Sequence, residues 1–443
     1  MSFPRFRQHK HSGIDWIPVI PADWRSVRTK EVVSFTTGWT PPTGDSASYE
    51  GENLWANISD LGPRQLLDTA KRVSDGAVET SRLKPSPKGS LLFSFKLSVG
   101  QVSFAGRDMF TNEAIATFHP SPLLHLGFAY YALPLFLLQN AEENIYGAKL
   151  LNQELIRSAK FPLPTFEAQA AIASFLDWET RKIDELVEEQ RQLIALLDEK
   201  RQAVISHAVT KGLKPGVPLK ASGFESIGEI PLHWEVLPLK RDSTLVTSGS
   251  RGWAEHYADD GALFLRIANL TRASICLDLT DTQRVSVPAG SEGTRTMVQP
   301  GDVLFSITAN LGSVAVVPHG IETAFVSQHL ALARLQQART LPRWVGFVAL
   351  SAPGKAWFAM QGYGGAKVQL SLDDVREMPI PTPPLTEQRE LVAHIEHVAA
   401  AVDSLAGEAL RAIELLLERR SALITAAVTG QIDVRALAST EAP

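Results

Sequence analysis

Apolar residues recur at every third and fourth position between Glu167 and Val209, and the same pattern returns 219 residues later. Alternating steps of four and three are typical of the seam of a coiled coil. A helix of about 40 residues is roughly 60 Å long and cannot bury its own apolar stripe, but two such helices can bury each other. The pattern therefore predicts two long helices that pair. The predicted apolar seam positions are Ile172, Leu176, Ile183, Leu186, Leu193 and Leu197 in the first helix, and Leu391, Ile395, Val402, Leu405, Leu416 and Leu423 in the second.

Polar residues also fall on the predicted seam, at Gln190 and Lys200. Polar seam residues fix the register of a coiled coil at some cost in stability. Two unrelated amphipathic helices are the alternative interpretation. The same seam spacing is kept over ten positions in each helix, which argues against two unrelated helices.

The repeat extends beyond the helices. Ile20-Pro21-x-x-Trp24 recurs as Ile230-Pro231-x-x-Trp234, and residues 161–165 (FPLPT) recur as 378–382 (MPIPT). We interpret the chain as a tandem duplication, in which each half is one globular domain followed by one long helix. The predicted limits are 1–165 for the first globular domain, 166–213 for its helix, 214–383 for the second domain, 384–430 for its helix and 431–443 for a tail.

The globular halves mix two kinds of hydrophobic pattern. Short apolar runs at 90–95, 302–307 and 314–317 predict buried strands, whereas 126–138 and 344–350 are longer and predict helices. Each half ends in Pro-x-Pro, which we expect to close the domain because proline does not continue regular structure. An α+β fold with a small antiparallel or mixed sheet fits best. If the long helices run antiparallel, the duplication gives the molecule pseudo-two-fold symmetry.

The composition is that of an ordinary globular protein, with 44% apolar and 21% charged residues. Cys276 is the only cysteine, which excludes an internal disulfide and a cysteine-built zinc site. The longest apolar run, 126–138, is too short to span a bilayer and contains Pro134. These features indicate a soluble protein of the reducing cytoplasm.

The net charge of −5 at first argues against a nucleic-acid binder. The acidic residues are concentrated, however: 167–201 contains nine acids and five bases, and 385–424 contains seven acids and four bases. The rest of the chain is therefore mildly basic. A polyanion would avoid the helices and could bind the globular parts.

Taken together, these features resemble the DNA-specificity subunit of type I restriction-modification systems. The residues that carry the resemblance are Lys10-His11-Ser12-Gly13 with Ile20-Pro21-x-x-Trp24, their second copy at 220–234, Pro300-Gly301-Asp302-Val303-Leu304, and the Pro-x-Pro motifs followed by Glu167 and Gln169 or by Glu387-Gln388. No single motif is specific, but their order is repeated at nearly constant spacing over most of the chain. The second helix departs from the pattern because it opens with a slightly longer segment, 382–387.

The resemblance implies that each globular part is a target-recognition domain for one half of a split DNA site, and that the antiparallel helices set the gap between the halves. It implies two modification (methyltransferase) subunits and a restriction (helicase-nuclease) subunit as partners. No cofactor is expected in this chain, whereas the methyltransferase partner is expected to use S-adenosylmethionine. The loops between the matched segments differ strongly, as in 37–43 and 248–253, which indicates two different targets unless these loops have simply drifted.

Arg and Lys suit phosphates and guanine edges, and Asn and Gln suit adenine. The candidate DNA contacts are Arg64, Lys84, Lys88, Lys96 and Lys149 in the first domain, and Arg251, Arg266, Arg272, Asn310 and Lys367 in the second. Trp39 and Trp253 could lie at the DNA face or in the core. The basic arm 5–10 could follow phosphates or be a frayed end.

No catalytic motif is apparent. Gly354-Lys355 lacks the rest of a phosphate-binding loop, His-Glu-x-x-His is absent, and neither Thr40-Pro41-Pro42 nor 382–384 forms an amino-methyltransferase tetrapeptide. The sequence therefore predicts a non-catalytic DNA-recognition subunit with no metal site. A protein-binding scaffold with two heads on a coiled-coil strut, and an enzyme with an unrecognised site, are the alternatives.

Overall fold

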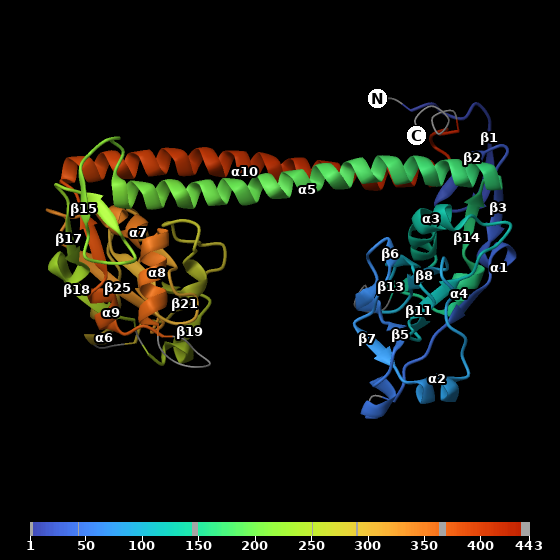
Figure 1. Cartoon of the computed structure of the whole chain (residues 1–443), viewed down its shortest axis with the longest axis horizontal. Helices are drawn as coiled ribbons and strands as arrows, with labels where there is room; N and C mark the ends of the chain where they lie inside the picture. The colour runs from blue at the N-terminus through green and yellow to red at the C-terminus, as the bar shows by residue number, and fades with distance from the viewer. Residues whose placement is uncertain are drawn as a thin grey trace. The chain divides into compact units, whose positions relative to one another are not determined.

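The computed structural model describes residues 3–42, 44–143, 149–249, 251–288, 291–362 and 369–435. The chain forms two compact units: unit 1 comprises residues 1–189 and 412–443, and unit 2 comprises residues 190–411. Each unit contains one globular part and a segment of each long helix (Figure 1). We call the globular parts head 1 (3–165) and head 2 (212–384).

The main sheet of head 1 has five strands in the order β4-β11-β8-β9-β6. Its strands are β4 Phe35–Thr37, β11 Ile115–Phe118, β8 Leu91–Ser94, β9 Val102–Ala105 and β6 Gln65–Leu66. A second sheet contains β10 Phe110–Thr111, β5 Asn53–Ala56 and β7 Lys71–Val73. Helix α3 Leu126–Gln139 packs on β8 and β9 and buries Phe128, Leu133 and Phe136 in the largest core cluster of unit 1.

Shorter elements complete head 1. They are β1 His9–Ile14, β2 Ile17–Pro21, β3 Arg25–Arg28, α1 Thr29–Val32, α2 Asp75–Ser81, β12 Glu142–Glu143, β13 Lys149–Leu150, α4 Gln153–Ser158 and β14 Lys160–Leu163. The basic arm is not frayed, because Phe6 packs on Trp24 with ring centroids 5.8 Å apart, and His9 and Lys10 belong to β1.

The main sheet of head 2 has four strands in the order β18-β25-β22-β23. They are β18 Ser243–Ser248, β25 Leu330–Leu335, β22 Val303–Ser306 and β23 Val314–Val316. A second sheet contains β19 Tyr257–Ala258, β21 Arg284–Val285, β20 Ala262–Leu265 and β24 Ala324–Val326. Helix α7 Pro342–Leu350 packs on β22 and β23 as α3 packs on β8 and β9 in head 1.

The other elements of head 2 are β15 Leu219–Ala221, β16 Glu229–Pro231, β17 Glu235–Pro238, α6 Ser291–Thr296, α8 Ala352–Gln361, α9 Leu372–Arg376 and β26 Pro379–Thr382. The predicted α+β fold, with two tandem globular parts each followed by a long helix, is confirmed.

Pro164 lies just beyond the end of β14, but the other three prolines of the Pro-x-Pro motifs belong to strands, so the expectation that proline does not continue regular structure was wrong for them. Pro162 lies in β14, which pairs with β3, and Pro379 and Pro381 lie in β26, which pairs with β17. Both sheets have only two strands, so every strand is an edge on which a missing N–H can be tolerated.

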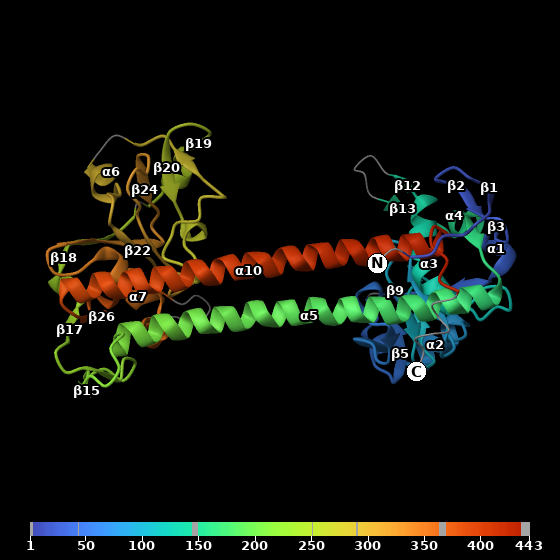
Figure 2. The same cartoon turned by 90° about the horizontal axis from the view of Figure 1, so that it is seen from above.

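The long helices are α5 Phe166–Lys211 and α10 Leu385–Val428. In unit 1, Asp184 of α5 pairs with Arg420 of α10, and in unit 2 Arg201 pairs with Asp403. In both views the start of α5 lies beside the end of α10 (Figures 1 and 2). The segments within each unit therefore pack antiparallel, as predicted.

Part of the predicted seam was wrong. Ile172, Leu176, Ile183, Leu197, Leu391, Ile395, Val402 and Leu423 are buried and Leu416 is half-buried. Leu186, Leu193 and Leu405 are instead 44%, 41% and 48% exposed. The buried stripe of α5 runs through Thr180, Ile183, Val187 and Leu197, so Val187 takes the place assigned to Leu186. Each mistaken leucine has a small or branched apolar neighbour that fits the seam, and periodicity alone does not choose between adjacent apolar residues.

Lys200 was also placed wrongly. It is exposed, whereas Arg201 beside it is buried against Asp403. Gln190 is half-buried, in keeping with its predicted seam position.

A buried glutamine anchors the first turn of each long helix to its own head. Gln169 accepts from the N–H of His125 (2.8 Å) and donates to the carbonyls of Leu123 and Pro164 (3.1 and 3.0 Å). Gln388 accepts from the N–H of Leu341 and donates to the carbonyls of Arg339 and Pro383, each at 2.9 Å. These two bond sets are counterparts, so the duplicated motif has a structural role in both halves.

Candidate nucleic-acid interface

Three loops of head 1 meet at one end of its main sheet, and we call them the loop face of head 1: residues 36–40, 95–101 and 111–114. Strands β4 and β8 end there, whereas β9 and β11 begin there, because these four strands pair antiparallel. The N–H of Trp39 donates to the carbonyl of Thr111 (2.9 Å), and the N–H of Phe95 donates to the carbonyl of Ala114 (2.9 Å). These bonds hold the three loops together.

The loop face of head 2 has the same construction from residues 247–249, 307–313 and 326–329. The N–H of Gly249 donates to the carbonyl of Leu330 (3.1 Å), and the N–H of Ile307 donates to the carbonyl of His329 (3.1 Å). Strands β18 and β22 end at this face, whereas β23 and β25 begin there.

One glycine in each head allows the first loop to approach the third. A Cβ on Gly38 would lie 1.7 Å from the carbonyl oxygen of Thr111, and a Cβ on Gly249 would lie 2.1 Å from that of Val326. No other residue fits such an approach without moving the backbone. The two loop faces are thus built by equivalent contacts.

The side chains on the two faces differ. Head 1 presents Lys96, Leu97 and the pair formed by Thr40 and Glu113. The bond from the Thr40 hydroxyl lowers the pKa of Glu113, so this carboxylate is charged at neutral pH. The same strand-end positions in head 2 carry Gln328 and His329, and Asn310 is exposed on the hairpin loop. Head 1 therefore presents the Glu113 carboxylate where head 2 presents the Gln328 amide, and the guanidinium of Arg295 reaches the head 2 face at Thr247 and Ser248.

A cleft of about 330 Å³ adjoins the loop face of head 1. Trp39, Arg82, Lys84, Phe110 and His119 are among the residues that line it. Burial lowers the pKa of His119, whose Nε2 lies 3.1 Å from the Thr36 hydroxyl. The cleft combines aromatic surface with two exposed cations, a combination that suits a nucleic acid.

The predicted DNA contacts of head 1 lie in two kinds of surroundings. Lys84, Lys88 and Lys96 are exposed. Lys84 lines the cleft, and Lys96 lies on the loop face. Arg64 instead pairs with Asp177 of α5 at 2.6 Å and stacks on Tyr130, and Lys149 pairs with Glu143 at 2.7 Å. The DNA-contacting roles of all five residues stay predictions.

The predicted contacts of head 2 are also dispersed. Asn310 lies on the loop face, and Arg251 and Arg272 are exposed. Arg266 pairs with Asp281 at 3.1 Å beside a short 3₁₀ turn. Lys367 lies outside the described residues. These roles too stay predictions.

The two tryptophans left open by the sequence have different surroundings. Trp253 is buried against Phe264 and Phe325, so it belongs to the core. Trp39 is half-buried, packs edge-on against Phe110 with centroids 5.4 Å apart and also lines the cleft.

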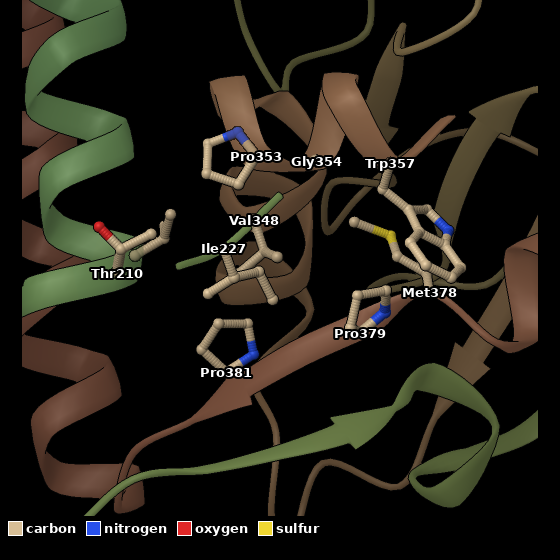
Figure 3. Close-up of a pocket in the computed structure, with 10 residues that line it drawn as sticks. Thr210, Ile227, Val348, Pro353, Gly354, Trp357, Met378, Pro379 and Pro381 are labelled. Atoms are coloured by element: carbon tan, nitrogen blue, oxygen red, sulfur yellow. The ribbon is translucent and has the colours of Figure 1, made fainter. Parts of the chain in front are cut away.

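A small apolar cavity in unit 2 is too tight for a ligand. It lies between the end of α5, at Thr210, and Pro353, Trp357 and Pro379 (Figure 3). Its volume of about 10 Å³ is near the minimum for a single water molecule. We regard it as a packing defect between helix and head.

Among the described residues, no group of three or more His, Cys, Asp or Glu is placed to hold a metal ion. In the same part of the chain, no helix combines the length and apolar character needed to cross a bilayer.

The structure thus defines a class: a duplicated α+β protein whose heads carry equivalent loop faces with unlike side chains. Residues 21–196 match the family model of the type I restriction modification DNA specificity domain. That part of the chain is therefore similar to this domain.

Curated relatives extend the match. The chain is 24% identical over 314 residues to the type I restriction enzyme EcoBI specificity subunit of Escherichia coli, covering 69% of this chain and 65% of the relative. It is also 24% identical over 274 residues to the MjaIX specificity subunit of Methanocaldococcus jannaschii, covering 59% and 61%. The alignments thus span slightly less than two thirds of these relatives' lengths.

Solved structures show the same fold. A chain from a type I restriction-modification system, solved to explain complex assembly and conformational transition, superposes with a TM-score of 0.69 at 17% identity, covering 93% of this chain and 99% of that one. The HsdS subunit of Thermoanaerobacter tengcongensis superposes with a TM-score of 0.52 at 17% identity, covering 93% and 98%. The resemblance to type I specificity subunits is confirmed.

Proposed function

We propose that this protein is the DNA-recognition subunit of a type I restriction-modification complex, with one half of a bipartite site bound at each loop face. The observation that carries the proposal is the pair of loop faces. The bond donated by Phe95 in head 1 recurs as the bond donated by Ile307 in head 2, and both faces have the same close glycine approach, yet they present different exposed side chains. Two faces of one design with unlike side chains suit two different short sequences.

In this proposal the chain itself catalyses no reaction and requires no cofactor, and the complex acts in the cytoplasm. Methyl transfer would come from two modification subunits that use S-adenosylmethionine, and DNA cleavage from a restriction subunit. The proposed domain limits are those of the duplication, with heads at 1–165 and 214–383.

Exposed leucines on the long helices provide surface for these partners. In unit 2, Leu193, Leu196, Leu405 and Leu410 are 41–62% exposed, and in unit 1 Leu186, Leu415 and Leu417 are 44–66% exposed. Burying leucines that lie outside the helix–helix seam under another protein would stabilise the complex.

Binding by the reconstituted complex tests the proposal. The chain with its modification subunits should bind a duplex carrying its bipartite site at least about 1,000-fold more tightly than random DNA at physiological salt. Equal affinity for both duplexes would contradict DNA recognition.

Exchanging one head tests the assignment of half-sites. Replacing residues 1–165 by the first head of another specificity subunit should change one half-site and leave the other unaltered. Methylation mapping checks this, and a change in both half-sites would contradict the one-head, one-half-site assignment.

A further inference from the structure

Both heads have a non-glycine residue with a strained, left-handed backbone at the tip of the hairpin that follows the central strand. Leu97 has φ of 59° between β8 and β9, and Ala309 has φ of 62° between β22 and β23. Side chains with a Cβ rarely adopt this left-handed conformation, which glycine accepts without strain. Among the described residues only one other non-glycine residue, Arg82, has a positive φ, and it lines the cleft beside the loop face of head 1.

The tip is a tight three-residue turn in both heads. The N–H of Val99 donates to the carbonyl of Leu97 (2.8 Å), and the N–H of Leu311 donates to that of Ala309 (2.9 Å). The central residue of each turn, Ser98 or Asn310, has no positive φ, so the strain lies in the residue before it. A non-glycine residue in the left-handed region persists only when its surroundings enforce it.

In each head a buried serine at the end of the preceding strand holds the turn by hydrogen bonds. In head 1 the hydroxyl of Ser94 donates to the carbonyl of Ser98 (2.5 Å), and the carbonyl of Ser94 accepts from the N–H of Gly100 (2.9 Å). In head 2 the hydroxyl of Ser306 donates to the carbonyl of Thr308 (2.9 Å). The tip residue is therefore displayed on a fixed support.

What the two tips display is different. The side chain of Leu97 is 90% exposed, the largest value among the exposed large apolar side chains of the described residues. It stands next to Lys96, whereas Ala309 has only a methyl group and stands next to Asn310. An exposed leucine contributes no buried area to the stability of the free protein. Because the turn already fixes its backbone, little conformational entropy is lost when a partner covers it.

We propose that Leu97 is a specificity-determining residue that packs on the C5-methyl group of a thymine in the half-site bound by head 1. The proposal rests on the proposed function and deepens it. Thymine is the base that offers a methyl group in the major groove, where apolar side chains recognise it. Lys96 would contact a neighbouring phosphate and place the tip. Ala309 carries only a methyl group at the matched position, so head 2 offers a smaller apolar surface there.

The test uses the complex with its modification subunits and its own bipartite duplex. Leu97→Ala, which copies the side chain of the head 2 tip, should lower affinity about 5- to 30-fold, as expected for the loss of one specific base contact. Replacing the contacted thymine by uracil, which lacks the methyl group, should lower the affinity of the wild type and leave that of Leu97→Ala unchanged. Val19→Ala, at an apolar position that is 55% exposed on β2, is the matched control and should bind like the wild type.

Thiol protection provides a measurement that does not depend on an affinity change. In a Cys276→Ser background, the thiol introduced by Leu97→Cys should react with maleimide in the free complex and be protected by the specific duplex. The thiol introduced by Val19→Cys should react equally in both states. A duplex with a scrambled first half-site should not protect either thiol.

The outcomes separate the two proposals. A wild-type complex without sequence preference would refute the proposed function itself. A complex that binds its site specifically, but shows no effect of Leu97→Ala, no effect of uracil at any position, or no A·T pair in the first half-site, would overturn the role of Leu97 alone.

Discussion

The Nε atom of Arg420 lies 2.9 Å from Oδ1 of Asp184, and the duplication relates this ion pair to a second one. Adding 219 to Asp184 gives Asp403, and subtracting 219 from Arg420 gives Arg201, and these two residues also pair. Each helix therefore supplies the arginine of one pair and the aspartate of the other. Within both units the helices are antiparallel in the same register, as expected of a chain paired with its own copy.

Reversing the charge of Asp403 should show that its pair with Arg201 favours the observed register of the two long helices. Asp403→Arg would place two guanidinium groups together, and we expect a loss of about 1 kcal/mol in the free energy of unfolding, because Asp403 is 65% exposed and solvent screens it. Adding Arg201→Asp should restore a part of this loss, as a double-mutant cycle measured by urea unfolding would show. Lys200→Asp, at an exposed neighbour, is the control. No recovery in the double variant would contradict the pairing.

The glutamine anchors should matter more than any surface ion pair. Gln388→Leu leaves one N–H and two carbonyls without a side-chain partner, so we expect a loss of about 2–4 kcal/mol in the free energy of unfolding. Gln169→Leu should cost a similar amount, because its three bonds are equivalent. Arg389→Leu, at the exposed next residue, is the control. A loss below about 0.5 kcal/mol for both glutamine variants would show that the anchors are dispensable.

The sequence was sufficient to predict the helices and strands that follow from local hydrophobic periodicity or from the repeat. The long helices, strands β8 and β22 and the apolar helix α3 follow from periodicity and appear close to the predicted bounds. The seam was less predictable, because Leu186-Val187 and Leu193-Ile194 offer two adjacent apolar residues at one turn. Tertiary packing selects Val187, and periodicity does not encode that choice.

The loop faces were beyond prediction for a different reason. Thr40 and Glu113 meet only because Gly38 lets two distant loops touch, and a single sequence contains no measure of that contact. Arg64 looked like a DNA-contacting cation, but its partner Asp177 lies more than 100 residues away. The matched positions of Gly38 and Gly249 in the repeat were the one available signal for the faces.

Lys96 should contribute charge rather than specificity. Lys96→Ala in the complex should weaken binding to all sequences alike and reduce the slope of log affinity against log salt by about 1, because one phosphate contact is lost. Filter binding between about 50 and 200 mM salt measures the slope. Lys160→Ala, at an exposed lysine on β14, should leave it unchanged. An unaltered slope for Lys96→Ala would remove this residue from the interface.

Glu113 should discriminate one base pair of the first half-site. A carboxylate accepts a hydrogen bond from the N4 of cytosine, whereas the amide that head 2 carries at this position, Gln328, suits adenine. We expect Glu113→Gln to shift the preference at one position by about 1–3 kcal/mol, measured as relative affinities for the four base pairs there. The second half-site serves as the internal control. An unchanged preference would contradict a base contact by Glu113.

The Thr40–Glu113 bond also predicts a pH dependence. The bond lowers the pKa of Glu113, so its contribution to stability is present above the pKa of the unfolded chain, about 4.3, and is lost as the pH falls through the lower folded value. The melting temperature of Thr40→Val should therefore lie furthest below that of the wild type above about pH 5, and the two should converge at lower pH. Ser59→Ala, at another hydroxyl residue of head 1, is the control for loss of a hydroxyl. A difference that grows on acidification would contradict the sign.

The length of the paired helices should set the gap between the half-sites. The seam repeats every seven residues, so an insertion must add seven residues to both helices, after Leu186 in α5 and at the facing turn of α10, to keep Val187 and its neighbours buried. Seven residues add about 10 Å, close to 3 base pairs at 3.4 Å each. Methylation mapping should therefore find both half-sequences unchanged and their separation about 3 base pairs longer. An insertion of five residues in each helix is the matched control, because it turns the seam away from its partner and should destabilise the pair. If the seven-residue insertion folds and methylates DNA with the original spacing, the helices do not measure the gap.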